Sequence, residues 1–452
     1  MQRSMKALAL EEPPSRRALL AEESRAFASY WAMLAIRASL FAIAVLLNGD
    51  FHPQLVPGGE GSAVQQYLGL LAWLVIIGAS YFAPQRLVVE WTVGLYVNLA
   101  FYGLALLSFL WSQNVAASAP KCVALLIVLW GSWRLTLMLD WEEIVARTHD
   151  GLFLVGVASC IVSLAFPSIG LQDTWQHAGQ WNGVFISKQT LGVVGAVQLF
   201  QASYLMMNGA RSPYYWLSAL VAVICVVASG SRGGGALAVA ALVSLYIMRL
   251  SPGFARMMAY VPFLMGLVAA ALIADLLYTQ NRYLVIYGVA LDFTERTFIW
   301  QHALRYIWMH PWLGYGLNGF WTLDWVKALY LERYSWFLDN YHSGYINILV
   351  ETGFVGYGLF LLSYLFFGLR ANDIARARYY PERYTSFGLA FTFLLFLIDF
   401  TETFFLRSTN FRTTMLTMIL AMTFARPASP VHDAQESAPP ASSSRRLRRS
   451  AR

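Results

Sequence analysis

Residues 339–356 read DNYHSGYINILVETGFVG. His342 stands at the entrance of an apolar run that continues to about residue 368, and Glu351 lies inside that run. A run of this length, folded as a helix, matches a bilayer whose hydrocarbon core is about 30 Å thick. The stretch therefore predicts a membrane-spanning helix over 343–368 that carries one titratable group at its mouth and another in its interior.

The rest of the chain repeats this apolar pattern. Of its 452 residues, 58% are hydrophobic and 13% are charged, whereas soluble domains contain about 25% charged residues. The runs lack the alternation of a transmembrane barrel. We predict an all-α, polytopic integral membrane protein of about twelve transmembrane helices. Arg37, Lys121 and Asp399 interrupt or border the first, fourth and eleventh of them. The predicted spans are 29–47, 66–83, 88–111, 120–138, 150–168, 184–207, 213–229, 233–250, 256–277, 343–368, 385–402 and 409–425.

The positions of Lys and Arg predict the orientation. They gather in one set of connections and in the RRLRRSAR tail, while the connections at about 48–65 and 112–119 carry none. Because Lys and Arg favour the cytoplasmic side, we expect a multi-pass protein of the cell inner membrane with both termini in the cytoplasm. No cleavable signal peptide is expected. The predicted parts are a cytoplasmic segment (1–28), a transmembrane domain (29–425) and a disordered basic cytoplasmic tail (426–452).

Several ligand classes are not expected. The net charge of +7 follows from topology and from contact with anionic membrane lipids, not from nucleic-acid binding. The three cysteines lie inside predicted helices without a CxxC spacing, which favours a packing role. The seven histidines form no HxxxH or HExxH pair, so neither a metal site nor a cofactor is predicted.

The longest connection, residues 278–342, is predicted to lie on the outer, periplasmic side. It is rich in tryptophan, which favours the membrane–water interface, and loops of this length are usually functional. The segment ERTFIWQHALRYIWMHP (295–311) has helical spacing and ends at Pro311, and GYGLNGF (314–320) has the glycines of a turn. We expect a helix and then a turn, both lying against the outer leaflet.

Positive residues in the outward segments need their own explanation, because they are under-represented there. Arg232 lies in SGSRGGG, whose glycines form either a nest of N–H groups for an anion or only a tight turn. Lys188 lies just inside a helix, where it needs a carboxylate or a polar cavity. With Arg296 and Arg305 of the long loop, these cations predict a lipid-anchored anion, since guanidinium groups bind phosphate in a bidentate manner.

Three segments together resemble the O-antigen ligase and polysaccharide polymerase superfamily of membrane glycosyltransferases. They are SGSRGGG with Arg232, TERTFIWQHALRYIWMHPWLGYGLNGFW with Arg296, and the opening stretch, in which His342, Ser343, Gly353 and Gly356 fit the spacing of the ligases. The likeness covers about residues 180–420. It implies a GT-C-like membrane fold and, on the periplasmic face, transfer of a glycan from undecaprenyl diphosphate to a saccharide or lipid A-core acceptor.

The resemblance also implies roles for individual residues. His342 is the expected general base, and Arg232 and Arg296 are the expected catalytic cations that hold the diphosphate without a metal ion, in an inverting transfer. Lys188 and Arg305 are further substrate-binding candidates. The segment WNGVFISKQTLG departs from the family, which has Lys-Asn where this chain has Lys188-Gln189. DFTETFFLRS (399–408) is closer to the exopolysaccharide-production branch, which favours a polymerase over a ligase.

Alternative interpretations stay open. His342 is either catalytic or a cap of the following helix, and Glu351 is interpreted as a buried counter-ion for another helix. Gly353 and Gly356 predict close helix packing, and a continuous helix would place them on the same stripe as His342. A flippase for lipid-linked oligosaccharides is the alternative function, although we find no convincing internal repeat. A non-enzymatic scaffold leaves the spacing from His342 unexplained.

Overall fold

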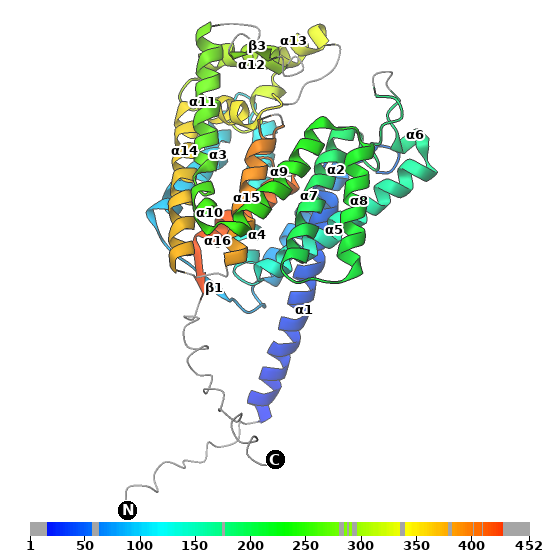
Figure 1. Ribbon diagram of the computed structural model, residues 1–452. Helices are drawn as coiled ribbons and strands as arrows, with labels where there is room; N and C mark the ends of the chain where they lie inside the picture. The colour runs from blue at the N-terminus through cyan, green and yellow to red at the C-terminus, as the bar shows by residue number, and fades with distance from the viewer. Residues whose placement is uncertain are drawn as a thin grey trace, which may run out of the picture.

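The protein was analysed as a computed structural model, which describes residues 16–56, 63–173, 177–279, 284–286, 289–291, 296–334, 340–377, 382–400, 402–408 and 410–427. Within these residues the regular elements are helices, apart from short strands that form two antiparallel pairs (Figure 1). The all-α class predicted from the sequence is confirmed. The predicted disordered tail lies outside the described residues from 428 onward, as do the first 15 residues of the N-terminal segment.

Eight of the described helices are long and apolar enough to cross a membrane. Each overlaps one of the predicted spans, so the polytopic character of the protein follows from the structure as well. The eight are α1 (Arg16–Leu46), α3 (Val93–Leu107) with the 3-10 turn η1 (Ser108–Leu110), α4 (Val115–Thr136), α5 (Trp141–Ala165), α7 (Lys188–Met207), α9 (Arg232–Leu250), α11 (Val261–Thr279) and α14 (Gly344–Ala377).

The four remaining predicted spans also contain helices, but these are shorter. They are α2 (Ala63–Ala79), α8 (Pro213–Ala228), α15 (Glu382–Ile398) and α16 (Phe411–Thr423). The total of twelve spans therefore stays a prediction. The short elements between the long helices are α6 (Pro167–Gly170), α10 (Pro252–Met258), α12 (Arg296–Ile307), η2 (Phe320–Thr322) and α13 (Asp324–Tyr334).

Two predicted spans are not single helices. Residues 88–111 do not form one helix, because β1 (Leu87–Val89) pairs with β4 (Ala425–Pro427) before α3 begins. The span 256–277 is interrupted between α10 and α11. Pro262 explains this break, because proline donates no N–H and its ring clashes with the carbonyl four residues earlier, so α10 cannot continue through it and α11 restarts with proline in its first turn.

The two ends of the helix bundle carry different elements. Figure 1 shows α12, α13 and β3 at one end, and the start of α1 together with β1 at the opposite end. The strand β2 (Leu284–Ile286) pairs with β3 (Val289–Leu291) next to α12. The described elements of the long connection therefore lie at the opposite end of the bundle from the start of α1 and from β1 (Figure 1). Which end faces the periplasm stays a prediction.

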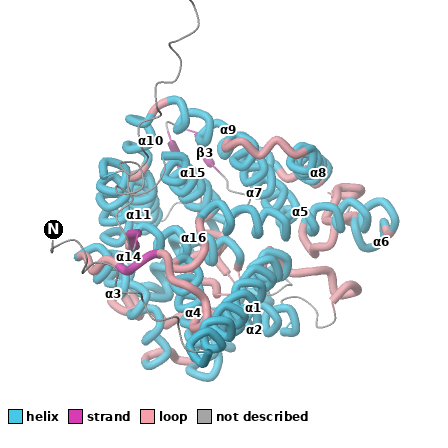
Figure 2. Tube along the Cα trace, turned by 90° about the horizontal axis from the view of Figure 1, so that it is seen from below, coloured by secondary structure: helices cyan, strands magenta, loops and turns pink. Residues whose placement is uncertain are grey.

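Close packing around α7 and α14 positions the candidate site. α7 packs against α5, α8 and α9 (Figure 2), and a Cβ on Gly234 of α9 would lie 2.7 Å from the backbone carbon of Gly192 of α7. α14 packs against α3 and α11. Small residues allow such close approach between membrane helices. The N-terminal ends of α7, α12, α14 and α16 meet around one cavity.

Candidate active site

A cavity of about 220 Å³, which we call the histidine cavity, brings together charged residues from separate elements. Arg296 comes from the first turn of α12, His342 from the turn before α14, Glu402 from the connection between α15 and α16, and Arg412 from the first turn of α16. Polar residues at the start of α7 and after α1 complete the wall. They are Ser187, Gln189, Thr190 and Asn48.

The backbone around His342 is held in an unusual conformation. Its φ of 49° lies in the left-handed region, which few non-glycine residues adopt. Its N–H donates to Asn340 Oδ1 at 2.8 Å, and two residues later Gly344 N donates to the carbonyls of Asp399 at 2.8 Å and Glu402 at 3.1 Å. A Cβ at Gly344 would lie 1.7 Å from Asp399 Oδ2. The start of α14 is therefore fixed against the α15–α16 connection.

This anchoring places the side chains of Arg296, Glu402 and His342 in a row. One oxygen of Glu402 lies 3.3 Å from the Arg296 guanidinium, and the other lies 3.9 Å from His342 Nδ1. Burial alone raises the pKa of Glu402, but the contact with His342 and the charges of Arg296 and Arg412 outweigh burial and hold it below its ordinary value. Glu402 is therefore ionised at neutral pH and faces the imidazole.

Glu402 and Arg412 were not among the residues predicted for the site. Arg412 Nε donates to Asn410 Oδ1 at 3.1 Å, and its guanidinium lies over the Phe404 ring, 5.7 Å from the centroid. The sequence signal was present but weak. Arg412 lies near the start of the predicted span 409–425, and a cation that begins an apolar helix is costly unless it faces a polar site. Glu402 is the last residue of the preceding predicted span, 385–402.

The other predicted cations do not line the histidine cavity. Arg232 is exposed at the start of α9, and its positive charge repels that of Lys188. Lys188 is buried, and its ammonium donates to the amide oxygen of Gln180. Arg305 is exposed on α12. Of the two interpretations of SGSRGGG, the structure favours the turn at Gly234 and Gly235, because their N–H groups donate to Ser231, the N-cap of α9. This run of glycines serves helix capping and the approach to α7.

Residues 217–361, which include Arg232, Arg296 and His342, match the family described as O-antigen ligase. The resemblance to the O-antigen ligase family is confirmed. Over 243 residues the chain is also 26% identical to the exopolysaccharide production protein ExoQ of Rhizobium meliloti (strain 1021). That match covers 49% of this chain and 53% of ExoQ, so it spans about half the length of the relative.

The glycine-rich turn docks into a kink of α14. Gly353 has φ 67° and ψ −170°, which opens the helix. Tyr315 N and Gly316 N donate to the carbonyls of residues 350 and 351, and the N–H groups of residues 354 and 355 donate to Pro311 and Trp312. A Cβ at Gly353 would lie 2.3 Å from the Trp312 carbonyl. α14 is therefore not a continuous helix, and the stripe that a continuous helix would have formed from His342, Gly353 and Gly356 does not exist.

Glu351 is a buried counter-ion, as predicted, but its partner belongs to a connection and not to a helix. Its carboxylate lies 3.2 Å from the Arg407 guanidinium and accepts from Asn318 N at 3.0 Å. Arg407 also donates to Asn318 Oδ1 at 3.0 Å and to Asn347 Oδ1 at 2.8 Å. This network ties the glycine-rich turn, α14 and the α15–α16 connection together behind the histidine cavity.

A second cavity, of about 350 Å³, lies on the other side of this connection. We call it the amide cavity, because Gln65, Gln66, Asn318, Asn340 and Asn410 line it together with Trp321. Asn410 lines both cavities. Among the described non-glycine residues, those with positive φ are Asn318, His342 and Leu406, and each lines one of the two cavities. Backbone strain of this kind concentrates at functional sites.

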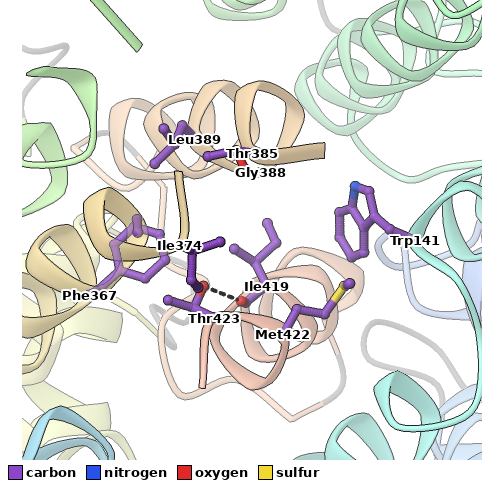
Figure 3. A pocket seen from close by; sticks show the side chains of 10 residues that line it. Trp141, Phe367, Ile374, Thr385, Gly388, Leu389, Ile419, Met422 and Thr423 are labelled. Atoms are coloured by element: carbon purple, nitrogen blue, oxygen red, sulfur yellow. Dashed lines mark hydrogen bonds between the residues drawn. The ribbon is translucent and has the colours of Figure 1, made fainter. Parts of the chain in front are cut away.

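A third cavity has a different character. It holds about 60 Å³ between α14, α15, α16 and Trp141, and Figure 3 shows mainly apolar side chains around it. The hydroxyl of Thr423 donates to the Ile419 carbonyl of its own helix at 2.8 Å. This space is a packing gap between helices. In the described parts of the chain, no group of three or more His, Cys, Asp and Glu side chains gathers that could ligate a metal ion.

Proposed function

We propose that this chain is a membrane glycosyltransferase that moves a glycan from undecaprenyl diphosphate to an acceptor hydroxyl on the periplasmic face, with inversion and without a metal ion. The main support is that Arg296 and His342, from two separate matched motifs, meet beside Glu402 in one cavity. The similarity to ExoQ and the segment 399–408 favour a polymerase of exopolysaccharide over a ligase. We place the protein in the cell inner membrane with both termini in the cytoplasm.

The chemistry of the proposed transfer follows from the positions of His342, Glu402 and the two arginines around the cavity. The acceptor oxygen forms a bond to the anomeric carbon while the bond from that carbon to the diphosphate breaks. His342 takes the proton of the acceptor hydroxyl, and the Glu402 carboxylate beside Nδ1 stabilises the imidazolium that forms. The electron pair leaves with the diphosphate, whose growing charge Arg296 and Arg412 stabilise.

The remaining predicted cations have a secondary role in this proposal. Arg232 and Lys188 form a positive centre at the starts of α9 and α7, next to the residues of α7 that line the histidine cavity. We propose that Arg232, helped by Lys188, binds an anionic part of the lipid-linked donor, and that Arg305 contributes to its attraction from the surface of α12.

The direct test supplies the purified protein with an undecaprenyl-diphosphate-linked oligosaccharide and separates the products by size. A ladder of lengths identifies a polymerase, and a single addition to lipid A-core or another acceptor identifies a ligase. A third result, movement of the lipid-linked saccharide across vesicles without any new glycosidic bond, identifies a flippase and rejects the proposal.

The assignment of the general base is tested in the same assay. We expect His342→Ala to lower turnover by about 10²–10⁴-fold, the usual contribution of a general base, with an unchanged melting temperature. His302→Ala, in α12 and outside the lining of the histidine cavity, is the matched control and retains turnover. Full activity of His342→Ala rejects the role.

A further inference from the structure

The amide cavity has the size and surface of a binding site, and none of the residues given a role in the transfer lines it. Its volume of about 350 Å³ falls in the range of small-molecule pockets, about 300–1,000 Å³. Five of its lining side chains are amides, and Thr322, Thr403 and Ser408 add hydroxyls. Amides and hydroxyls both donate and accept hydrogen bonds, as the hydroxyls of a sugar require. Trp321 adds an apolar face for the carbons of a sugar ring.

The charges of the two cavities divide them between two kinds of ligand. In the histidine cavity two guanidinium groups stand against one carboxylate, which favours an anion. In the amide cavity the positive charge of Lys121 is matched by the negative charge of Asp50, which lines the same cavity. The charge of Arg407 is balanced by Glu351. A wall with balanced charge and many neutral polar groups favours an uncharged polyol over a diphosphate.

The amide cavity is also connected to the proposed base. Asn340 lines it and accepts the backbone N–H of His342, so the two cavities are separated at this point by a turn of two residues. Asn410 lines both cavities, and of the consecutive residues after α1, Asn48 faces one while Gly49 and Asp50 face the other. A ligand in the amide cavity is therefore separated from His342 only by this turn and by Asn410.

We propose that the amide cavity binds the acceptor saccharide, with a neutral sugar ring against Trp321 and its attacking hydroxyl directed to His342. This inference rests on the proposed glycosyl transfer. It adds a location for the acceptor that is distinct from the diphosphate site at Arg296 and Arg412.

The test measures binding apart from turnover. The probe is the free oligosaccharide that mild acid releases from the lipid-linked repeat, and its binding to the full-length protein in detergent is followed by calorimetry. Gln66→Trp on α2 and Lys121→Trp on α4 fill the cavity from two walls, and Gln66→Ala and Lys121→Ala leave it open. Melting temperature and elution volume establish that each variant folds.

We expect the wild type to bind the oligosaccharide, and Gln66→Ala and Lys121→Ala, which each remove one polar group of the wall but leave the space open, to bind it only a few-fold more weakly. Each tryptophan variant should bind it at least about tenfold more weakly than the alanine variant at the same position, while it still retains the lipid-linked donor. Normal oligosaccharide binding by folded tryptophan variants overturns the assignment. Loss of the lipid-linked donor in the same variants overturns it as well, because the cavity would then hold the glycan of the donor.

These outcomes are separate from the fate of the proposed function. If the wild type forms no glycosidic bond but the tryptophan variants still lose the oligosaccharide, the transfer reaction is rejected and the saccharide site stands. If transfer proceeds at the wild-type rate in the tryptophan variants, the transferase stands and the acceptor site is rejected.

Discussion

Two arginine–glutamate pairs hold the α15–α16 connection, and they differ in exposure. Arg296 and Glu402 are 3.3 Å apart, with side chains 22% and 31% exposed, and they line the histidine cavity. Arg407 and Glu351 are 3.2 Å apart, but the glutamate side chain is only 1% exposed. The first pair faces a space that a substrate can enter, whereas the carboxylate of the second is enclosed by protein.

The partners of each pair show what the difference means. Arg407 is held by Glu351, Asn318 and Asn347, so its geometry is fixed by three protein acceptors. Glu402 instead lies 3.9 Å from His342 Nδ1, beyond hydrogen-bond distance, and can tighten this contact when the imidazole gains a proton. The buried pair is therefore expected to stabilise the fold, and the cavity pair to serve the reaction.

The strongest test of the comparison is Arg407→Ala. It leaves Glu351 buried without its counter-ion, which we expect to cost about 3–5 kcal/mol of stability, seen as a lower melting temperature in detergent. The double variant Arg407→Ala with Glu351→Gln removes both charges and should recover most of the loss. A single variant as stable as the wild type would show that the buried pair is not structural.

Arg296→Ala should have the opposite profile. The pair it breaks is partly exposed, and such pairs contribute at most about 1 kcal/mol to stability, so the melting temperature should change little. Turnover should fall by about 10²–10³-fold, as for the loss of one donor to a developing anion. Arg296→Lys keeps the positive charge but not the planar guanidinium, so its turnover should lie between that of the wild type and that of Arg296→Ala. Unchanged turnover with a lower melting temperature would reverse the assignment.

The sequence predicted the parts of the site that depend on local pattern. The helix before Pro311, the turn at GYGLNGF and the position of His342 before an apolar helix all follow from spacing and from glycine and proline chemistry. Arg296 and His342 were found because each belongs to a motif of its own.

The sequence could not predict which residues meet these two. Glu402 is 106 residues from Arg296, and no periodicity links the two segments. The kink at Gly353 was missed for a similar reason. A glycine in an apolar run indicates close packing, but only the docked turn at 311–316 shows that the helix opens there to accept its N–H groups.

Gly353→Ala sharpens the structural half of the comparison, because this kink supports the turn to which Glu351 is bound. A side chain at φ 67° is strained, and its Cβ would lie 2.3 Å from the Trp312 carbonyl. We expect a loss of about 2–4 kcal/mol, measured by thermal unfolding. Gly358 of the same helix has no atom within 4 Å of its Cβ position, so Gly358→Ala should be neutral or slightly stabilising. Equal effects of the two substitutions would contradict the docked kink.

The smallest expected effect is a pH dependence of the cavity pair. The pKa of Glu402 is lower in the folded protein than its ordinary value of about 4.3, so the stabilisation it supplies is complete above that pH and is lost as the pH falls through the lowered pKa. Because the side chain is 31% exposed, we expect less than about 1 kcal/mol. The melting temperature of Glu402→Gln should therefore lie slightly below that of the wild type at pH 6–8 and approach it below about pH 4. The exposed Glu332 of α13 provides a control, and Glu332→Gln should show no such gap. A gap for Glu402→Gln that widens as the pH falls would mean that the carboxylate is held protonated, and the imidazole of His342 would then lack the counter-charge that the proposed reaction requires.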